Sequence, residues 1–263
     1  MEPKLGKEVM PNPRLIHDRK LILGYSGVVG VDEAGRGCLA GPVIAGCVIL
    51  PKEFFRKATN RKWIEKINDS KQFDEANREE LFDRIQGSID DGELFGETGT
   101  ASVKEIEKHN IVGATCLAMQ RAMEDASRKS GELWVPLPHQ ELGLFCENEE
   151  QSQDWQVLVD GRPMKKLVYQ HHGLVKGDRI SLAVAMASLL AKVTRDRLMR
   201  KLNDEFPYYG FSSNKGYGAP LHLEALKKFG PSVHHRPKFL RKLFSEAPSE
   251  ESSRSGQTRL SLA

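Results

Sequence analysis

Runs of apolar residues separated by polar turns predict both strands and helices along this chain. Residues 21–32 and 42–50 are apolar runs rich in valine and isoleucine, and each is suited to a buried strand. Their link is short and rich in glycine, which favours an antiparallel hairpin. Similar stretches at 94–100 and 157–159 predict two more strands, and residues 167–169 are a candidate for another.

Apolar residues at helical spacing fill much of the rest of the chain. Asp74 is suited to cap a helix, and Ser102 with Glu105 fits a capping box. The predicted helices cover residues 57–68, 75–90, 102–108, 112–129, 181–205, 221–229 and 238–244. Strands first and only helices at the end indicate an α/β sheet domain with a helical C-terminal appendage.

The distribution of polar residues indicates the boundaries of this organisation. Residues 1–20 are polar, contain three prolines and are expected to form a flexible lead-in. The sheet domain covers residues 21–206, and its acidic, proline-containing segment 132–156 is expected to be a surface insertion. Residues 207–244 combine a glycine- and aromatic-rich loop with short helices, and the Ser-, Glu- and Pro-rich tail 245–263 is expected to be disordered.

Composition narrows the class of protein without defining its chemistry. The 263 residues carry a net charge of +3 and a pI near 8.6, which permits a nucleic-acid partner but does not require one. The four cysteines lack the spacing of a zinc site and indicate reduced thiols. The sequence shows no secretory signal and no apolar run of about 20 residues, so we expect a cytoplasmic protein.

Candidate chemistry begins with carboxylates at the ends of predicted elements. Asp32 and Glu33 end the first apolar run, Asp160 ends the strand at 157–159, and Asp178 precedes the long helix at 181–205. Carboxylates from separate segments are how proteins assemble a site for two cations about 4 Å apart, which act on a phosphodiester. Taken singly, Asp160 also fits an ordinary turn and Asp178 an N-cap.

The strand geometry places a condition on this site. Neighbouring residues of a strand point to opposite faces, so Asp32 and Glu33 can share a site only if the strand ends at or near Asp32. Gly35 and Gly37 would permit the turn that follows. Asp196 lies inside the long helix between two arginines, and we interpret it as a salt-bridged support rather than a fourth ligand.

Several motifs together resemble one family. Residues 31–37 (VDEAGRG) and 39–43 (LAGPV) are similar to the opening motif of the type 2 ribonucleases H, the family of bacterial ribonuclease HII. Further matches follow in the family's order at residues 69–71, 110–115, 159–161, 176–178, 187–197, 209–218 and 235–236. The chain departs from the pattern at Cys38, Asn214 and Ala219, where proline, histidine and threonine are usual. The resemblance covers roughly residues 27–240.

The resemblance implies a fold, an activity and a set of ligands. The fold would be a ribonuclease H-like mixed sheet flanked by helices, with residues 21–206 as the catalytic domain and 207–244 as a helical substrate-binding subdomain. The activity would be hydrolysis of RNA in RNA–DNA hybrids and cutting 5′ of ribonucleotides embedded in duplex DNA, leaving 3′-hydroxyl and 5′-phosphate ends. It would use two Mg²⁺ or Mn²⁺ ions. The four metal-binding and catalytic carboxylates would be those of Asp32, Glu33, Asp160 and Asp178.

The resemblance also assigns residues to the substrate. Gly35, Arg36 and Gly37 match the motif that recognises the 2′-hydroxyl through its backbone, and Tyr217 matches the tyrosine that packs on the sugar at the RNA–DNA junction. The 2′-hydroxyl is the group that separates RNA from DNA, so this assignment is chemically consistent. The lysines expected to contact phosphates, with a solvated surface position as the alternative for each, are Lys71, Lys192 and Lys215.

Two alternatives to this function and one possible partner stay open at the level of sequence. Ribonuclease HIII is a related enzyme that usually carries an extra N-terminal substrate-binding domain, and we expect the residues before the core to be too few for such a domain. A hybrid-binding module without catalysis is the alternative from another class. We expect a monomer that contacts no membrane. The C-terminal tail is expected either to be simply disordered or to dock weakly on a sliding clamp.

Overall fold

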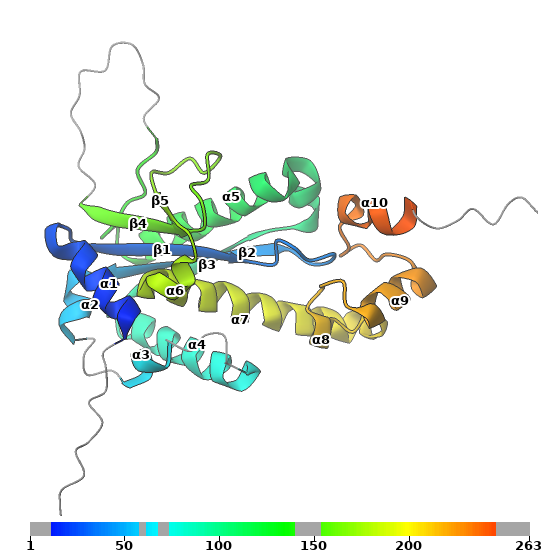
Figure 1. The fold of residues 1–263 in the computed structure, drawn as a ribbon, viewed down its shortest axis with the longest axis horizontal. Helices are drawn as coiled ribbons and strands as arrows, with labels where there is room; N and C mark the ends of the chain where they lie inside the picture. Colours follow the sequence, from blue (N-terminus) through cyan, green and yellow to red (C-terminus); the bar gives the residue numbers. More distant parts are fainter. Residues whose placement is uncertain (1–11, 58–61, 68–73, 140–153, 246–263) are drawn as a thin grey trace, which may run out of the picture.

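A five-stranded mixed sheet forms the centre of the molecule. The computed structural model describes residues 12–57, 62–67, 74–139 and 154–245. The strand order is β3-β2-β1-β4-β5 (Figure 1). The strands are β1 Gly27–Ala34, β2 Val43–Pro51, β3 Phe95–Ala101, β4 Trp155–Asp160 and β5 His172–Leu174. β1 pairs antiparallel with β2, which confirms the predicted hairpin, and parallel with β4. β3 joins β2 antiparallel, and β5 joins β4 parallel.

Helices cover both faces of this sheet. The α-helices are α1 Pro13–Leu21, α2 Lys52–Lys57, α3 Lys62–Lys66, α4 Glu75–Asp90, α5 Val103–Lys129, α6 Gly177–Ile180, α7 Leu182–Glu205, α8 Phe211–Asn214, α9 Pro220–Phe229 and α10 Pro237–Ser245, and two 3-10 helices are η1 Ile22–Gly24 and η4 Pro207–Tyr209. α5 lies on one face, and α7 lies on the other with α4 outside it (Figure 1). Among the described helices, none is long and apolar enough to cross a membrane.

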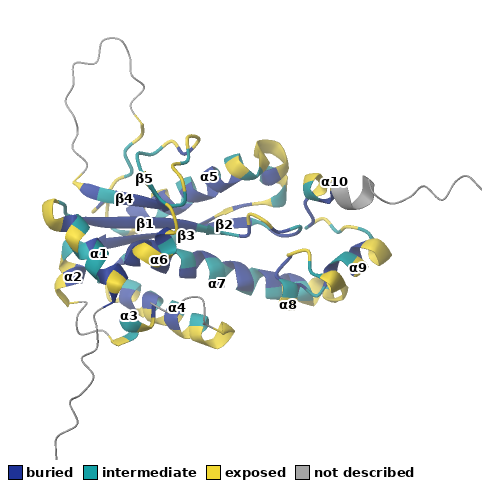
Figure 2. Cartoon of the chain, in the orientation of Figure 1, coloured by how far each residue is buried: buried dark blue, intermediate teal, exposed yellow. Residues whose placement is uncertain are grey.

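The side chains of β1 alternate between two hydrophobic cores. Val28 packs with residues of α4 and α7, whereas Val29 and Val31 pack with residues of α5. The strands are buried, and so are the surfaces of α5 and α7 that face the sheet (Figure 2). α7 lies directly on the sheet, because a Cβ on Gly30 would come within 2.1 Å of the Ala183 carbonyl carbon. The register of α7 against β1 is therefore fixed by backbone contact.

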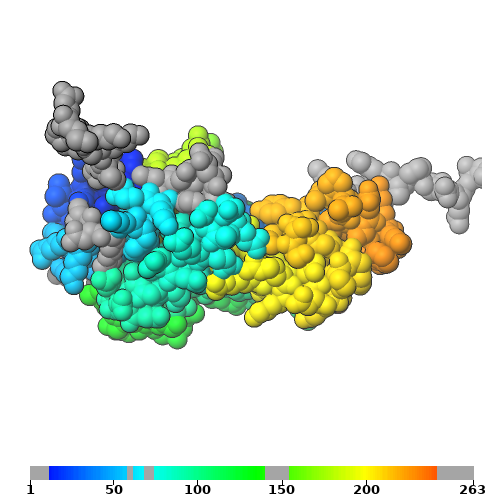
Figure 3. Space-filling view, turned by 90° about the horizontal axis from the view of Figure 1, so that it is seen from below, coloured from blue at the N-terminus to red at the C-terminus, as the bar shows by residue number. Residues whose placement is uncertain are grey.

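The last three helices form a smaller unit at one end of the sheet. α8, α9 and α10 lie beyond the end of α7, and Figure 3 shows them in yellow and orange at one end of an elongated molecule. Their apolar side chains, which include Phe211, Leu226 and Leu240, make a separate small core together with Tyr209 of η4 and Met199 of α7. α9 and α10 confirm the helices predicted at 221–229 and 238–244, whereas a substrate-binding role for residues 207–244 stays a prediction.

Three local expectations are wrong. Residues 13–20 are helical and partly buried rather than a flexible lead-in. The polar residues Arg14 and Asp18 are among the buried residues of α1, so the polar composition of the segment was misleading. The last strand is His172–Leu174, whereas Tyr169 forms only an isolated bridge with Pro138. The predicted insertion 132–156 is too wide, since Trp134 is buried and β4 begins at Trp155; residues 140–153 lie outside the described residues.

Candidate active site

The two carboxylates of the opening motif lie where the edge of β1 becomes open. We expected the strand to end at or near Asp32. Instead, β1 continues through Glu33 to Ala34, and both Glu33 and Ala34 pair with β2. On its other side, the pairing of β1 with β4 ends at Val31 opposite Val159. The early end of β4, rather than of β1, is what exposes this edge.

The pleat of the strand turns these carboxylates to opposite faces. Asp32 shares the α7 face with Val28, and its carboxylate accepts a hydrogen bond from Ser188 of α7. Glu33 lies on the α5 face, where it pairs with Arg36 at 2.8 Å. Both side chains lie within electrostatic range of Asp160. The open edge thus brings the two carboxylates near a common third one.

Asp160 and Asp178 reach this edge from the end of β4 and from α6. The Gly177 N–H donates to Asp160 Oδ1 at 2.6 Å, so the start of α6 is fastened to the end of β4. Lys176 precedes that helix in the left-handed region, with φ 60°, and turns the chain toward the sheet. Asp178 follows Gly177 in the first turn, which places it beside Asp160.

The electrostatics of the four carboxylates centre on Asp160. Burial raises the pKa of Asp32 well above its usual range, and repulsion from Glu33 and Asp160 raises it further. Burial and Asp160 also raise the pKa of Glu33 and of Asp178, against the opposing effects of Arg36 and Arg14. Asp160 is therefore a repulsive neighbour of all three. Such a group favours a cation of high charge at its centre.

The donor set fits a hard divalent cation in its chemistry. Carboxylate oxygens are the ligands that Mg²⁺ and Mn²⁺ prefer, and the raised pKa values show that the protein's own cations leave repulsion among them. Within the described residues, however, no three His, Cys, Asp or Glu side chains are gathered closely enough to hold an ion. Glu33 is held by Arg36, and Asp160 by Gly177, so binding would require some of these side chains to turn.

The glycine-rich loop after β1 is held by two buried arginines that the sequence did not reveal as functional. The Arg236 guanidinium donates to the carbonyls of Gly35, Arg36, Gly41 and Pro42 at 2.8 to 3.1 Å. Arg195 of α7 donates to the carbonyls of Ala40, Pro42 and Lys215 at 2.9 to 3.1 Å. Both side chains are 1% exposed. Their signal in the sequence was only that they fall within motifs of the resemblance.

The loop and Tyr217 face each other at the surface. Gly37 and Tyr217 are both exposed, and a Cβ on Gly37 would meet only Tyr217 Cε1, at 4.0 Å. Gly35 has φ 95°, and a Cβ there would overlap the Arg195 side chain. A hydrogen bond links the Tyr217 side chain to Cys38. Burial raises the pKa of Tyr217, and the neighbouring Cys38 raises it further. An exposed ring therefore stands beside a backbone that a ligand can approach closely.

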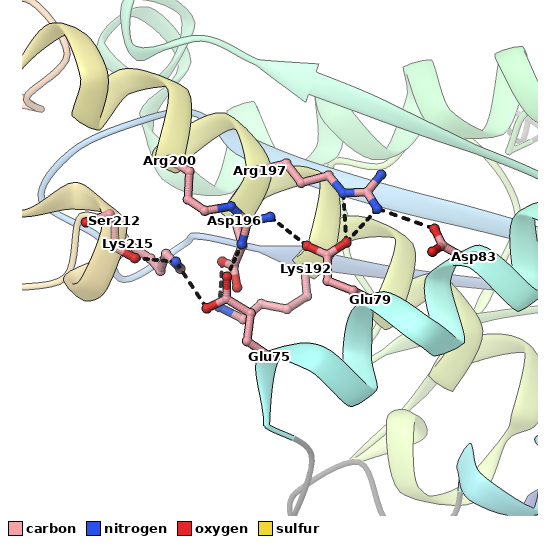
Figure 4. A network of polar contacts seen from close by, with 9 residues as sticks. All are labelled: Glu75, Glu79, Asp83, Lys192, Asp196, Arg197, Arg200, Ser212 and Lys215. Carbon is pink, nitrogen blue, oxygen red and sulfur yellow. Dashed lines mark hydrogen bonds and ion pairs between the residues drawn. The ribbon is translucent and has the colours of Figure 1, made fainter.

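The predicted phosphate-binding lysines have different surroundings. Lys192 pairs with Asp196 at 2.7 Å, which confirms the salt-bridged interpretation of Asp196. Lys215 is buried, bonds to the Ser212 carbonyl, and lies 3.5 Å from Glu75. Figure 4 shows both lysines in a network that joins α4, α7 and α8. Lys71 lies outside the described residues.

α1 contributes polar contacts behind Asp178, and no sequence signal indicated them. Arg14 Nε donates to the Asp178 carbonyl at 2.8 Å. Asp18, which is fully buried, accepts from the Ser181 hydroxyl and the Ala183 N–H at 3.0 Å each. These bonds fix α6 and the first turn of α7. A segment expected to be flexible therefore supports the carboxylate edge, that is, the open edge of the sheet where the four candidate carboxylates lie.

The solved structures that resemble this chain share its fold. Ribonuclease H2 from Pyrococcus horikoshii OT3 matches with a TM-score of 0.59 and 24% identity, covering 83% of this chain and 97% of that one. The PCNA:RNase HII complex from Archaeoglobus fulgidus matches with a TM-score of 0.55 and 21% identity, covering 80% and 93%. Bst-RNase HIII in complex with Mn²⁺ matches with a TM-score of 0.54 and 14% identity, covering 87% and 69%. These likenesses confirm the ribonuclease H-like fold.

Sequence comparison is more specific. Ribonuclease HII from Fusobacterium nucleatum is 41% identical over 241 residues, which cover 91% of this chain and 95% of that protein. Ribonuclease HII from Chlamydia muridarum is 38% identical and covers 92% of each. The model of the ribonuclease HII family matches residues 29–247, a range that includes the carboxylate edge, the clamped loop and Tyr217. The chain therefore belongs to the ribonuclease HII family and is a nuclease of the ribonuclease H type.

Proposed function

We propose that this chain cuts RNA–DNA hybrids, and duplex DNA on the 5′ side of an embedded ribonucleotide, by hydrolysis that leaves 3′-hydroxyl and 5′-phosphate ends. One observation supports it above the others. The open edge of β1, with Asp32 and Glu33, continues without a break into the loop that faces Tyr217. Residues that would hold metal and residues that would sense a sugar are thus consecutive in the chain.

Asp32, Glu33, Asp160 and Asp178 would hold the cations. When bound, divalent cations supply positive charge at the scissile phosphate and lower the pKa of the attacking water. The carboxylate oxygens orient those cations, and Ser188 and Gly177 orient Asp32 and Asp160 by hydrogen bonds. Arg14 and Asp18 fix the helix that carries Asp178. These hydrogen bonds matter because they orient the carboxylates, and the orientation of the carboxylates would determine the position of the metal.

The loop and Tyr217 would distinguish ribose from deoxyribose. Gly35 and Gly37 lack a Cβ, so a sugar can approach the backbone, and the flat face of Tyr217 can pack against it. Arg236 and Arg195 hold the loop's carbonyls in place before a substrate arrives. Such preorganisation lets the backbone hydrogen-bond a 2′-hydroxyl without first paying the cost of ordering the loop. Lys192, Lys215 and Lys71 remain proposed phosphate contacts.

A cleavage assay tests this function directly. The protein with Mg²⁺ or Mn²⁺ is mixed with a DNA duplex that holds one ribonucleotide, with an RNA–DNA hybrid, and with an all-DNA duplex of the same sequence. We expect one cut 5′ of the ribonucleotide, and product ends that a ligase requiring 3′-hydroxyl and 5′-phosphate accepts. Equal cutting of the all-DNA duplex, or binding without any cutting, would contradict the proposal. The second outcome would favour the non-catalytic binding module.

The C-terminal tail carries a separate proposal. Residues 246–263 lie outside the described residues, and their sequence ends in QTRLSLA. The Archaeoglobus ribonuclease HII was solved in complex with PCNA, and we propose that the tail of this chain docks on a sliding clamp. A pull-down with purified clamp compares the full chain with one that ends at Ser245. Equal capture of both would exclude the tail.

A further inference from the structure

Two buried histidines lie in contact behind Tyr217, outside the carboxylate edge. His222 of α9 is 0% exposed and His235, in the loop before α10, is 2% exposed. Their Nε2 atoms are 3.0 Å apart. A direct bond between two imidazoles requires one to donate and the other to accept, so it constrains the position of their protons.

The outer partners of this pair determine which nitrogen carries each proton. The Ser232 N–H donates to His235 Nδ1 at 2.9 Å, so Nδ1 is unprotonated and the proton of His235 lies on Nε2. His235 Nε2–H then donates to His222 Nε2, and the proton of His222 lies on Nδ1. That N–H donates to the Tyr217 carbonyl at 2.7 Å. One neutral tautomer of each ring satisfies every partner in this series.

The surroundings keep both rings neutral. Tyr209 packs edge-on against His235 with ring centroids 4.6 Å apart, and Phe211 packs edge-on against His222 at 5.4 Å. Burial lowers the pKa of His222, and burial together with His222 lowers the pKa of His235 to about 4. Neither ring carries a charge near neutral pH, which the hydrogen-bond series requires.

The series ends on the two elements proposed to sense the sugar. At one end, His222 holds the Tyr217 backbone, which the Ala219 N–H also holds at 2.8 Å. At the other end, His235 precedes Arg236, whose guanidinium donates to the Gly35 and Arg36 carbonyls. A continuous path of buried polar groups, through His222, His235 and Arg236, therefore joins Tyr217 to the loop. Cys38 makes a second link between the loop and the Tyr217 side chain.

We propose that His222 and His235 form a positioning pair that sets Tyr217 relative to the Gly35–Arg36–Gly37 loop and so determines the preference for a ribonucleotide junction. This inference rests on the proposed function of Tyr217. The pair touches neither the substrate nor the reacting atoms. Its contribution is geometric, because a displaced aromatic face loses its contact with the sugar while the carboxylate edge stays intact.

Two conservative variants of His222 separate the two ends of the pair. In His222→Asn the side-chain NH₂ lies near the former Nδ1, so the bond to the Tyr217 carbonyl is kept and the bond from His235 is lost. In His222→Gln the amide lies near the former Nε2, so the acceptor for His235 is kept and the bond to Tyr217 is lost. The measured quantity is the ratio of kcat/KM for the single-ribonucleotide duplex to that for an RNA–DNA hybrid, alongside the melting temperature.

We expect both variants to lower the substrate ratio and to differ in their melting temperatures. We expect His222→Gln to lower the substrate ratio about threefold to tenfold, the range for one hydrogen bond, with a melting temperature near that of the wild type. His222→Asn should also lower the ratio about threefold to tenfold, because the bond that joins His222 to His235 is lost, and it should melt at a lower temperature, because the buried His235 N–H loses its acceptor. A ratio that simply follows the melting temperature across both variants would overturn the positioning role.

A measurement on the unmodified protein tests the pair without any activity. The imidazole ¹⁵N–¹H correlation spectrum should show the proton on Nδ1 for one buried ring and on Nε2 for the other, assigned with the two His222 variants. Two rings of the same tautomer, or a charged ring at neutral pH, would overturn the pair. Failure of wild-type protein to cut the single-ribonucleotide duplex would instead contradict the proposed function, so the two failures are distinguishable.

Discussion

Arg236 offers a severe test of how the loop after β1 is held, because this one side chain donates hydrogen bonds to four carbonyls of the loop. Replacing it with methionine keeps much of the volume but removes every donor. Two of the carbonyls keep another donor: Gly35 also accepts from the Cys38 N–H at 3.4 Å, and Pro42 from Arg195 Nε at 3.1 Å. The substitution therefore falls most heavily on the carbonyls of Arg36 and Gly41.

The expected loss of stability follows from these two bonds. Hydrogen bonds to a charged group contribute about 1.5–3 kcal/mol each, which gives roughly 3–6 kcal/mol for two. Part of this is offset, because a buried guanidinium no longer has to be desolvated. We expect a net loss of about 2–4 kcal/mol, or a fall in melting temperature of about 5–15 °C for a chain of this size. The fold survives, since domains have about 5–15 kcal/mol of stability.

The expected loss of activity is larger than the loss of stability suggests. A displacement near 1 Å of a positioning group can cost about a hundredfold in rate. We therefore expect Arg236→Met to lower kcat/KM about a hundredfold on the single-ribonucleotide duplex, measured well below the melting temperature. Arg236→Lys keeps the charge but has one nitrogen in place of a planar fork, so it should also lose at least about tenfold.

Two outcomes would refute this reasoning. Near wild-type activity of Arg236→Lys would show that charge, rather than the geometry of the fork, is what the loop needs. A lower melting temperature of Arg236→Met without loss of activity would show that the clamp only stabilises the fold. Arg128→Met is the matched control, because Arg128 is an exposed arginine of α5 with an ion pair to Asp125, and it should change neither quantity.

Three further predictions concern other parts of the molecule. Asp32→Asn should abolish cleavage while the affinity for the duplex, measured by fluorescence anisotropy, changes little; lost affinity would contradict a metal-ligand role. Asp18→Ala should lower the melting temperature by several degrees, since two hydrogen bonds at the start of α7 cost about 2–4 kcal/mol, and should lower kcat more than it raises KM. Arg121 and Ser102 lower the pKa of Glu105 to about 2, so wild-type protein should exceed Glu105→Gln in stability above about pH 4.5 and lose that advantage as the pH falls toward 2; a constant difference in acid melting curves would contradict this.

Apolar runs and local caps explain which elements could be predicted from sequence. β1 and β2 are buried along nearly all of their length, and β4 has a buried centre, so the existence of these strands and the first hairpin follow from the apolar pattern. Asn110 marks the break inside α5, with φ 56°, because its side chain accepts from the N–H groups of Val112 and Gly113. The break between the two predicted helices at 108–112 is thereby confirmed.

Elements held by polar or backbone contacts could not be predicted. β5 has three residues, and its place depends on pairing with β4 rather than on its own composition. α1 buries Arg14 and Asp18, which bond to Asp178 and Ser181, more than 160 residues away in the chain. The four carboxylates could be selected because they follow apolar runs or a glycine. The arrangement of Asp32 and Glu33 on an open strand edge depends on where β4 ends, which no local pattern near residue 32 records.

The clamped loop has a consequence for how the protein is made. Its carbonyl partners, Arg195 and Arg236, lie between 153 and 201 residues after the loop in the sequence. A ribosome releases the N-terminal part of a chain first, so the carboxylates of β1 and β4 leave the exit tunnel well before Arg236 does. A nascent or prematurely terminated chain can therefore contain every acidic residue of the site and still lack the arginines that hold the loop in place. Completion of translation thus acts as the last step in assembling the nuclease.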